Sequence, residues 1–456
     1  MGDEWQGRNV LVLGLGETGL SCIRWLARHG ARLAAADTRA APPALGALRA
    51  EHPQLRVALG PFDAQLLAGV DAVAASPGLA LREPVLRQAA RRGIEVVGDV
   101  EIFGRSVAGR QGVRVLGVTG TNGKSTVTSL AAAMGRAAGL RAQAIGNIGV
   151  PVLDALREAE AQGFPDLWVV ELSSYQLETT RSLLLDAATM LNVTQDHLDR
   201  YDTIDDYARA KERVFLHCRR RVVNRDDAWS MSMKNPGAWS FGLGVPRDDT
   251  EWGVDPERRV LRRGARELLP VELMPMAGLH NVANGLAAHA LATAVGVPPE
   301  PLARALAQFK GLPHRVQPVA EARGVRFYDD SKGTNVGAAV AALEGFDVPV
   351  VLIAGGDGKG QDFAPLAPAV QKHARAVVLI GRDADAIAAA LGPTGVAIER
   401  AATMEAAVES ALELAHEGDA VLLSPACASF DMFRNYGHRG DVFAVAARAL
   451  AARSVH

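Results

Sequence analysis

Short apolar runs rich in β-branched residues alternate with segments rich in Ala, Leu and Arg in three successive parts of the chain. The first part has strand patterns at 9–13, 32–36 and 71–75, and helical patterns at 18–29 and near 82–92. Strands that alternate with helices form parallel sheets covered by helices, which is the α/β class. The chain has 456 residues, and one core stops growing near ~250–300 residues, so we expect two to four domains.

The second part follows a charged stretch at 98–112 and opens with a strand at 113–118. A second strong strand pattern lies at 167–170. Less regular, Arg-rich sequence at 226–267 predicts turns and short hairpins, and an alanine-rich helix is expected at 281–295. Beyond a Gly-Leu-Pro break, the third part restarts with strands expected at 325–328, 348–353, 376–380 and 420–423.

The overall charge excludes some classes of partner. The 49 basic and 51 acidic residues nearly balance, so no global field recruits nucleic acid or an anionic membrane. No apolar run approaches the ~18–20 residues of a membrane span, and the first eight residues do not resemble a targeting peptide. Cys22, Cys218 and Cys427 have no paired spacing, which argues for a reduced cytoplasmic compartment and against structural zinc. We therefore expect a cytoplasmic protein with no nucleic-acid or membrane partner.

The strongest local motif is Gly117-Val-Thr-Gly120-Thr-Asn-Gly123-Lys124-Ser125, which leaves a predicted strand and enters a predicted helix. Glycines let backbone N–H groups approach phosphate oxygens, and the helix start adds its positive end. In such a loop Lys124 can reach the outer phosphates and the Ser125 hydroxyl can hold Mg²⁺. Position 118 is valine, so the first glycine of the usual phosphate loop is out of place. The motif still predicts a nucleoside triphosphate site.

Ionisable groups follow two further apolar runs of the second part. Glu171 ends a buried strand pattern, where an acid beside a phosphate loop is well placed to bind the nucleotide's metal. The segment at 192–201 brings Asp196, His197 and Asp199 together after another run, which indicates a second metal or phosphate position. Lys211 lies on the helix that comes next, and nothing local distinguishes it from a lysine on a solvated helix face.

The amino-terminal segment Gly14-Leu-Gly16-Glu-Thr-Gly19, followed by Asp37, has the spacing of a dinucleotide-binding fingerprint. Read alone it favours an NAD-dependent oxidoreductase. The same loop serves any nucleotide diphosphate, and Gly16 and Gly19 also suit close packing of a helix on a strand.

Three loops of the third part follow predicted strands and carry lysines or hydroxyls, at 329–335, 355–359 and 424–431, with Tyr436 just beyond. The carboxyl ends of parallel strands meet at one edge of a sheet. Lysines and hydroxyls gathered there suit a small dicarboxylate or a terminal phosphate.

Taken together, these motifs resemble the Mur ligase family, which also includes folylpolyglutamate synthase. The resemblance covers essentially the whole chain, with elements in family order at 119–125, Glu171, 192–201, 280–284, 312–315 and 330–335. It implies an α/β fold of three domains. These are a Rossmann-like N-terminal domain (1–98) for a UDP-linked substrate, a central P-loop ATPase domain with a mainly parallel sheet (99–311), and a Rossmann-like C-terminal domain (312–456) for an amino acid.

Within the family, the segments at 355–359 and 424–429 resemble the amino-acid pocket of D-glutamate-adding members, and the Asp-Asn-Pro-Arg signature of diaminopimelate-adding relatives is absent. The resemblance implies an ATP-dependent acid–D-amino-acid ligase that adds D-glutamate to UDP-N-acetylmuramoyl-L-alanine in peptidoglycan precursor synthesis. ATP would phosphorylate the substrate carboxylate, and the amine would attack the acyl phosphate. We expect a monomer that uses ATP and two Mg²⁺ ions.

The resemblance also implies residue roles, with Lys124, His197 and a carbamylated Lys211 as catalytic groups. The ATP contacts would be Gly120, Thr121, Asn122, Gly123, Lys124, Ser125, Thr126, Asn281, Asn284, Arg315, Asp330 and Lys332. The UDP-substrate contacts would be Thr18, Asp37, Thr38, Arg39, Ser76, Asn147 and His197. The D-glutamate contacts would be Thr334, Lys359, Ser429 and Tyr436, the last at a position usually occupied by phenylalanine. The metal ligands would be Ser125, Glu171, His197 and Lys211.

Three other functions stay open at this stage. An NAD oxidoreductase would use the first fingerprint but leave the second phosphate loop unexplained, and it would need no ATP. A nucleotide-controlled switch would turn ATP over slowly, whatever amino acid is present. A folylpolyglutamate synthase would not need the amino-terminal nucleotide-like domain.

Overall fold

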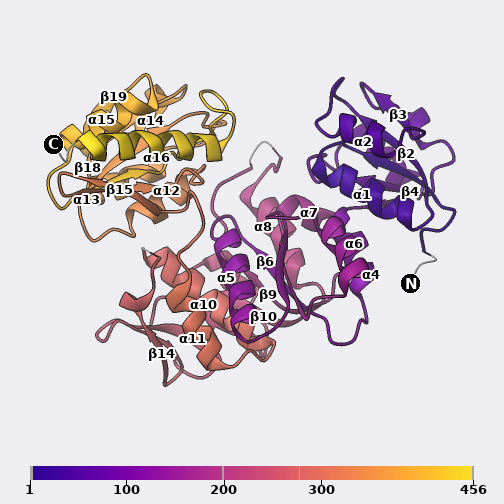
Figure 1. Ribbon diagram of the computed structural model, residues 1–456, viewed down its shortest axis with the longest axis horizontal. Helices are drawn as coiled ribbons and strands as arrows, with labels where there is room; N and C mark the ends of the chain where they lie inside the picture. The colour runs from indigo at the N-terminus through magenta and orange to yellow at the C-terminus, as the bar shows by residue number, and fades with distance from the viewer. Residues whose placement is uncertain (1–3, 198–199, 277, 454–456) are drawn as a thin grey trace.

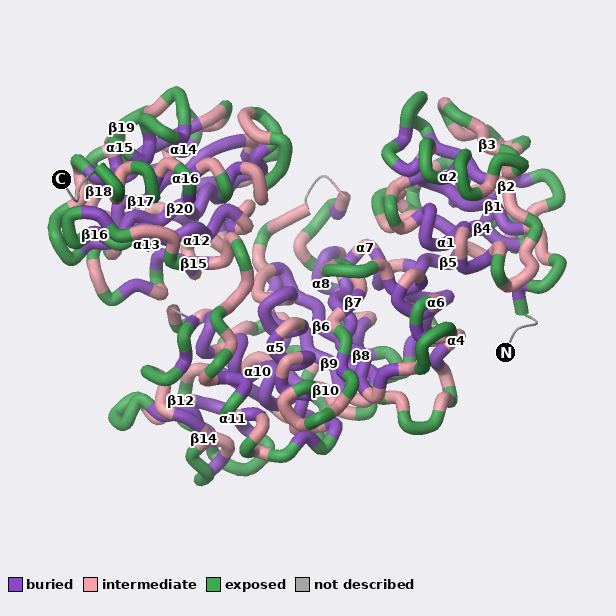
Figure 2. Tube along the Cα trace, in the orientation of Figure 1, coloured by how far each residue is buried: buried purple, intermediate pink, exposed green. Residues whose placement is uncertain are grey.

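The computed structural model describes residues 4–197, 200–276 and 278–453, which form three α/β domains (Figure 1). The N-terminal domain and the C-terminal domain stand on either side of a central domain, and each is built on its own sheet. The strands are largely buried and the outer helices and loops exposed (Figure 2). The predicted α/β class with mainly parallel sheets is confirmed. Among the described helices, none is long and apolar enough to cross a membrane.

The N-terminal sheet is wholly parallel, with the order β3-β2-β1-β4-β5. The order reverses between β1 and β4, which is where α/β sheets open a crevice for ligands. The glycine-rich loop after β1 and the turn after β4 therefore flank one crevice. The strands are β1 (Asn9–Leu13), β2 (Arg32–Asp37), β3 (Arg56–Leu59), β4 (Ala72–Ala75) and β5 (Glu95–Val97), and the helices are α1 (Glu17–Arg28), α2 (Leu45–Glu51) and α3 (Pro84–Arg91).

The stretch at 98–112, expected only as a charged separator, contains helix α4 (Asp99–Val107). Although the helix carries acidic residues, one of its faces is buried. Glu101 lies inside because the backbone N–H groups of Arg181 and Ser182 donate to its carboxylate, at 2.6 and 2.9 Å. On the same helix the Phe103 ring meets Trp168 edge-on, with centroids 5.7 Å apart.

The central sheet has nine strands in the order β14-β13-β12-β11-β10-β9-β6-β8-β7. Seven strands, from β7 through to β12, are parallel, and β13 and β14 add two antiparallel pairings beyond β12 at the edge. The expectation of only turns and hairpins at 226–267 was therefore incomplete, because four short strands there extend the sheet. The strands are β6 (Arg114–Thr119), β7 (Ala142–Gly146), β8 (Leu167–Glu171), β9 (Leu185–Met190), β10 (Cys218–Asn224), β11 (Trp239–Phe241), β12 (Glu251–Asp255), β13 (Val260–Arg263) and β14 (Arg266–Pro270).

Helices cover both faces of the central sheet (Figure 1). The helices are α5 (Lys124–Ala137), α6 (Val152–Gln162), α7 (Ser174–Glu178), α8 (Ile204–Glu212), α9 (Ala228–Ser232), α10 (Leu279–Ala294) and α11 (Pro299–Gln308). Helix α6 packs against α1 of the N-terminal domain, where Arg24 approaches Asp154 at 3.7 Å and Arg28 approaches Glu160 at 3.4 Å. One hydrophobic core runs through both domains, from Trp25 on α1 to Trp168 on β8.

The C-terminal sheet has the order β15-β16-β20-β17-β18-β19, parallel except for the β15–β16 pair. Because β16, β20 and β17 are neighbours, the three loops singled out in the third part do leave one edge of one sheet. The strands are β15 (Gln317–Ala322), β16 (Val325–Asp329), β17 (Val350–Gly355), β18 (Ala374–Ile380), β19 (Ala397–Arg400) and β20 (Ala420–Leu423), and the helices are α12 (Val336–Leu343), α13 (Ala367–His373), α14 (Ala384–Leu391), α15 (Met404–Leu414) and α16 (Tyr436–Arg453). The core of this domain is its own.

Candidate active site

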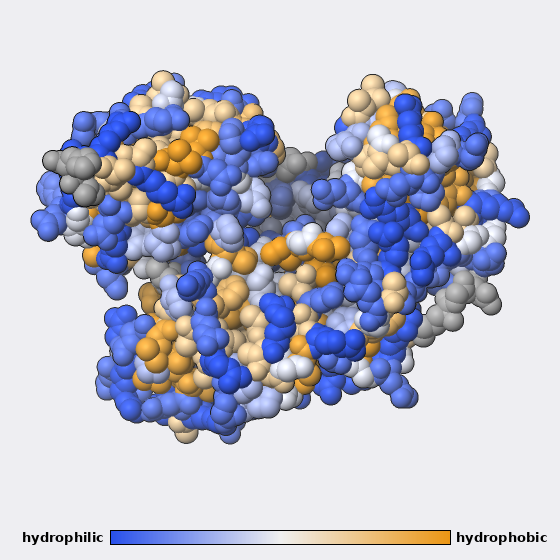
Figure 3. Space-filling model, viewed as in Figure 1, coloured by the Kyte–Doolittle hydropathy of each residue, from blue (hydrophilic) through white to orange (hydrophobic). Residues whose placement is uncertain are grey.

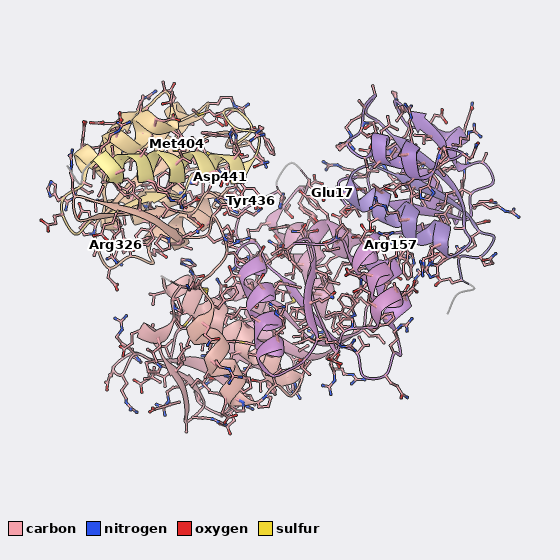
Figure 4. The ribbon with its side chains drawn as sticks, in the orientation of Figure 1. Glu17, Arg157, Arg326, Met404, Tyr436 and Asp441 are labelled. Atoms are coloured by element: carbon pink, nitrogen blue, oxygen red, sulfur yellow. The ribbon has the colours of Figure 1, made fainter. Side chains whose placement is uncertain are left out.

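A cavity of ≈ 850 Å³ lies where the three domains meet, and residues of all three line it. Figure 3 shows the molecule hollowed between the two outer domains, above the central one. Glu17 of the N-terminal domain and Tyr436 of the C-terminal domain both line this cavity and lie on opposite sides of the space (Figure 4). Residues more than 400 positions apart in the sequence can therefore contact ligands bound in the same cavity.

The phosphate loop joins β6 to α5 at the floor of the cavity. Gly123 has φ 84°, a conformation that a side chain would strain, and a Cβ there would lie 2.4 Å from the Asn284 side-chain oxygen. The Lys124 ammonium donates to the carbonyls of Gly120 and Thr121, at 2.8 and 2.7 Å. Burial lowers the pKa of Lys124. The Lys124 side chain is thus folded back onto the backbone carbonyls of the phosphate loop, at the start of α5.

Lys211 on α8 reaches the same loop. Its Nζ lies 2.8 Å from the Gly120 carbonyl oxygen and 4.3 Å from the centre of the Tyr207 ring, and the residue is only 1% exposed. Burial, and then the nearby Lys124 ammonium, lower the pKa of Lys211 well below its ordinary value. This lysine is therefore not on a solvated helix face, and its surroundings favour the neutral amine.

Glu171 ends β8 next to the loop and is 2% exposed. Asn147 donates to one of its carboxylate oxygens at 2.8 Å, while the other, Oε2, is buried with no hydrogen-bond partner among the described residues. A buried carboxylate oxygen without a donor is costly unless a cation faces it. No group of three or more His, Cys, Asp and Glu among the described residues could hold a metal, so a cation here needs other oxygens, such as the Ser125 hydroxyl and phosphate.

His197 lies in the loop between β9 and α8 and has a positive φ of 57°. Its Nδ1 lies 2.7 Å from the Tyr175 hydroxyl, so Tyr175 orients the ring toward the cavity that both residues line. The side-chain amide of Asn335, in the C-terminal domain, donates a hydrogen bond of 3.1 Å to the Asp196 carboxylate. Asp199, predicted as a partner of these groups, lies outside the described residues.

The C-terminal domain reaches the phosphate loop through two side chains. Arg315 donates to the Ser125 hydroxyl at 2.7 Å, and Asn335 exchanges amide hydrogen bonds of 3.3 Å with Asn122. Lys332 lies with its Nζ 3.9 Å from the centre of the Tyr436 ring. Burial, aided by Arg315 and Lys124, lowers the pKa of Lys332 to about 8.

The structure gathers most of the predicted site residues around the one cavity. Those that line it are Thr18, Ser76, Thr121, Asn122, Gly123, Lys124, Ser125, Asn147, Glu171, His197, Lys211, Arg315, Lys332, Thr334, Lys359 and Tyr436. Thr126 and Asn281 line a small second hollow that shares Arg315, and Asn284 donates to Asn281 at 3.2 Å. Asp37, Thr38, Arg39, Gly120, Asp330 and Ser429 are not among the lining residues.

Asp37 has a place inside the protein instead. It is 2% exposed, and its carboxylate accepts hydrogen bonds from the Leu15 N–H at 2.6 Å and from the Arg39 backbone and guanidinium at 2.7–2.9 Å. The Arg39 guanidinium holds the pKa of this carboxyl far below its usual range. In this structure Asp37 braces the glycine-rich loop. Ser429 is buried as well, and burial raises the pKa of Asp330 to about 7.

Three family models match the chain in order. They are described as the N-terminal domain of MurD-like Mur ligases (residues 8–98), the Mur ligase middle domain (118–292) and the Mur ligase glutamate ligase domain (314–427). The chain belongs to the Mur ligase family. It is 53% identical over 452 residues to the UDP-N-acetylmuramoylalanine–D-glutamate ligase of Methylobacillus flagellatus, covering 98% of each chain. It is 52% identical to the ligase of that name from Thiobacillus denitrificans, covering 98% of this chain and 97% of the relative.

Solved Mur ligases share the fold. The UDP-N-acetylmuramate–alanine ligase of Thermotoga maritima superposes with a TM-score of 0.56 at 18% identity and covers 98% of both chains. MurF from Acinetobacter baumannii gives a TM-score of 0.59 at 17% identity, covering 98% of this chain and 92% of its own. The three-domain architecture is therefore that of the family, and this Mur ligase is an ATP-dependent enzyme that forms amide bonds.

Several residues around the site of this Mur ligase were not predicted. Tyr207 lies one helical turn before Lys211 on α8, and this i, i+4 spacing is the signal that could have found it. Arg439 on α16 is fully buried and donates to the carbonyls of Ser331 and Cys427 at 2.8 and 3.0 Å, which ties two loops of the site together. An arginine on an amphipathic helix is usually exposed, so nothing in the sequence distinguished it.

Proposed function

We propose that this Mur ligase joins D-glutamate to UDP-N-acetylmuramoyl-L-alanine and converts ATP to ADP and phosphate. One observation carries the proposal. A single cavity is lined by the glycine-flanked crevice of the N-terminal domain, by the phosphate loop, and by the lysine and threonine loops of the C-terminal domain. The name of the two relatives described above agrees with this chemistry.

The geometry suggests how the chain performs the two steps. Lys124 and Arg315 bracket the position of the ATP phosphates, from the loop and from the C-terminal domain. Transfer of the terminal phosphoryl group to the alanyl carboxylate gives an acyl phosphate and ADP. The D-glutamate amine then attacks the carbonyl carbon, loses a proton, and phosphate leaves. Enclosure between three domains keeps water from the acyl phosphate.

The side chains of Glu171 and Ser125 fit Mg²⁺. Glu171 has a buried carboxylate oxygen without a hydrogen-bond partner among the described residues, and Ser125, on the phosphate loop, lines the same cavity with its hydroxyl group. We assign Ser125, Glu171, His197 and a carbamylated Lys211 as the ligands of two ions. When bound, these ions neutralise phosphate charge as it develops. The pKa of Lys211, lowered by burial, supports the carbamate, because only a neutral amine reacts with CO₂.

The remaining assignments follow from the family elements. We propose domains at 1–98, 99–311 and 312–456 for the UDP-linked substrate, ATP and amino acid, and a cytoplasmic monomer. The contacts of the UDP-linked substrate would be Thr18, Asp37, Thr38, Arg39, Ser76, Asn147 and His197, and Asp37 also bonds the glycine-rich loop. Thr334, Lys359 and Tyr436 would contact D-glutamate from the cavity wall, and Ser429 from behind it.

D-Glutamate should support turnover far better than L-glutamate, L-alanine or diaminopimelate. Lys359 and Thr334 line the cavity on the C-terminal side and can bind the carboxylates while the amine faces the acyl phosphate. Lys359→Ala should raise the KM for D-glutamate at least ~10-fold and leave that for ATP nearly unchanged, since a lost charged hydrogen bond costs about 1.5–3 kcal/mol. Phosphate release with each amino acid measures this. Lys372→Ala, on α13 of the same domain and outside the cavity, is the control. Equal rates with both glutamate enantiomers would contradict the assignment.

A further inference from the structure

Arg200 of the central domain contacts the N-terminal domain directly. Its guanidinium donates to the backbone carbonyl of Leu79 at 3.0 Å and to that of Gly78 at 3.4 Å. The same guanidinium pairs with the Glu178 carboxylate on α7 at 2.6 Å. The Arg200 side chain is 8% exposed, so these bonds are made largely out of water, where charge-assisted hydrogen bonds are stronger.

The carbonyls that Arg200 holds belong to a turn that forms a wall of the cavity. This turn, residues 76–79, follows β4, and Ser76, Pro77 and Gly78 line the cavity. It packs on the glycine-rich loop, since a Cβ added at Gly14 would lie 2.7 Å from the Ser76 Cβ. Arg200 therefore fixes, from the central domain, the wall that closes the crevice of the N-terminal sheet.

The flat face of the Arg200 guanidinium packs on the ring of Tyr175, the residue that orients His197. The Arg200 guanidinium carbon lies 4.4 Å from the centre of the Tyr175 ring, and the Tyr175 hydroxyl is the one 2.7 Å from His197 Nδ1. The backbone N–H of Arg200, and not its side chain, donates to the His197 carbonyl at 3.0 Å. The Arg200 side chain thus touches the 76–79 turn and Tyr175, while its backbone is bonded to His197.

We propose that Arg200 is a positioning residue for the UDP-linked substrate, which sets the distance between the 76–79 turn of the N-terminal domain and His197 in the central domain. The inference rests on the proposed function, in which that substrate spans the two domains. Arginine suits this task because its planar guanidinium donates in several in-plane directions and leaves its face free for an aromatic ring. A lysine ammonium could keep the ion pair with Glu178, but it could not also bond the carbonyls of the 76–79 turn and stack on the Tyr175 ring.

The test measures binding of UDP-N-acetylmuramoyl-L-alanine by calorimetry, without ATP, to full-length Arg200→Ala and Arg200→Lys proteins. We expect the dissociation constant to rise about 10-fold in the alanine variant and about 3-fold in the lysine variant. The dissociation constant of ADP, measured alone, should stay within about twofold, since Arg200 does not contact the phosphate loop. Arg209→Ala is the matched control, because Arg209 is an exposed arginine of the next helix that pairs locally with Asp206.

An unchanged affinity for the UDP-linked substrate in both variants would overturn the proposal. An equal loss of affinity for ADP would also overturn it, because it would show a general structural role. If the melting curve shows that the alanine variant does not fold, the lysine variant alone tests the proposal, through the same two dissociation constants, for the UDP-linked substrate and for ADP. Failure of the unmodified protein to bind or use UDP-N-acetylmuramoyl-L-alanine would instead refute the proposed function.

Discussion

Replacement of Lys211 by arginine should lower kcat about 10²-fold or more, as severely as replacement by alanine. That loss corresponds to roughly 3 kcal/mol of transition-state stabilisation. A lysine of ordinary pKa near ~10.4 would be an ammonium and would repel Mg²⁺, whereas its carbamate supplies an oxygen ligand that a hard cation prefers. Lys211 is buried 2.8 Å from the Gly120 carbonyl, beside a second lysine, where its neutral form is favoured. Steady-state phosphate release measures the loss.

Chemical rescue separates a carbamate from a simple positive charge. The alanine variant leaves space next to the Gly120 carbonyl, so added acetate or formate should restore part of its activity. The arginine variant should not respond, because its guanidinium fills that space. Arg209→Lys on the same helix, at an exposed position, should behave as the unmodified protein. Full activity of Lys211→Arg would show that only positive charge is needed at this position.

Replacement of Glu171 by glutamine should lower kcat by about 10³-fold, or ~4 kcal/mol, without lowering the melting temperature of the nucleotide-free protein. The amide oxygen can still accept the hydrogen bond from Asn147. The unpaired Oε2 contributes nothing favourable to folding, since a buried charge without a partner is destabilising. Catalysis, in contrast, would lose the negative ligand that we propose for the metal.

Magnesium titration of turnover gives the second measurement for Glu171→Gln. The half-saturating Mg²⁺ concentration should rise, and high Mg²⁺ should restore only part of kcat. Glu178→Gln makes a useful comparison, because Glu178 pairs with Arg200 and is not among the residues that line the cavity. A Glu171→Gln protein with normal turnover, or one that unfolds at a much lower temperature, would show that this carboxylate has a structural role.

The strand patterns at the phosphate loop, Glu171 and the three C-terminal loops were sufficient to predict which ends of which sheets lie around the cavity. This was possible because parallel strands place their carboxyl ends along one edge. Helix α4 was missed because the carboxylate of its Glu101 accepts from backbone N–H groups of a distant loop, which no local pattern reveals. For the same reason Arg439 and the bracing role of Asp37 could not be predicted: both depend on partners that only the folded chain brings close.

The continuous core that joins α1 to β8 has a thermodynamic consequence. The N-terminal and central domains share buried apolar residues, so neither can lose its packing without exposing surface of the other. The C-terminal domain packs its own core and meets the phosphate loop through single polar side chains. The molecule is therefore one large cooperative unit with a smaller one attached. The smaller unit can unfold at little energetic cost to the rest. With the domain roles that we propose, exchange of the amino acid need not disturb a bound UDP-linked substrate.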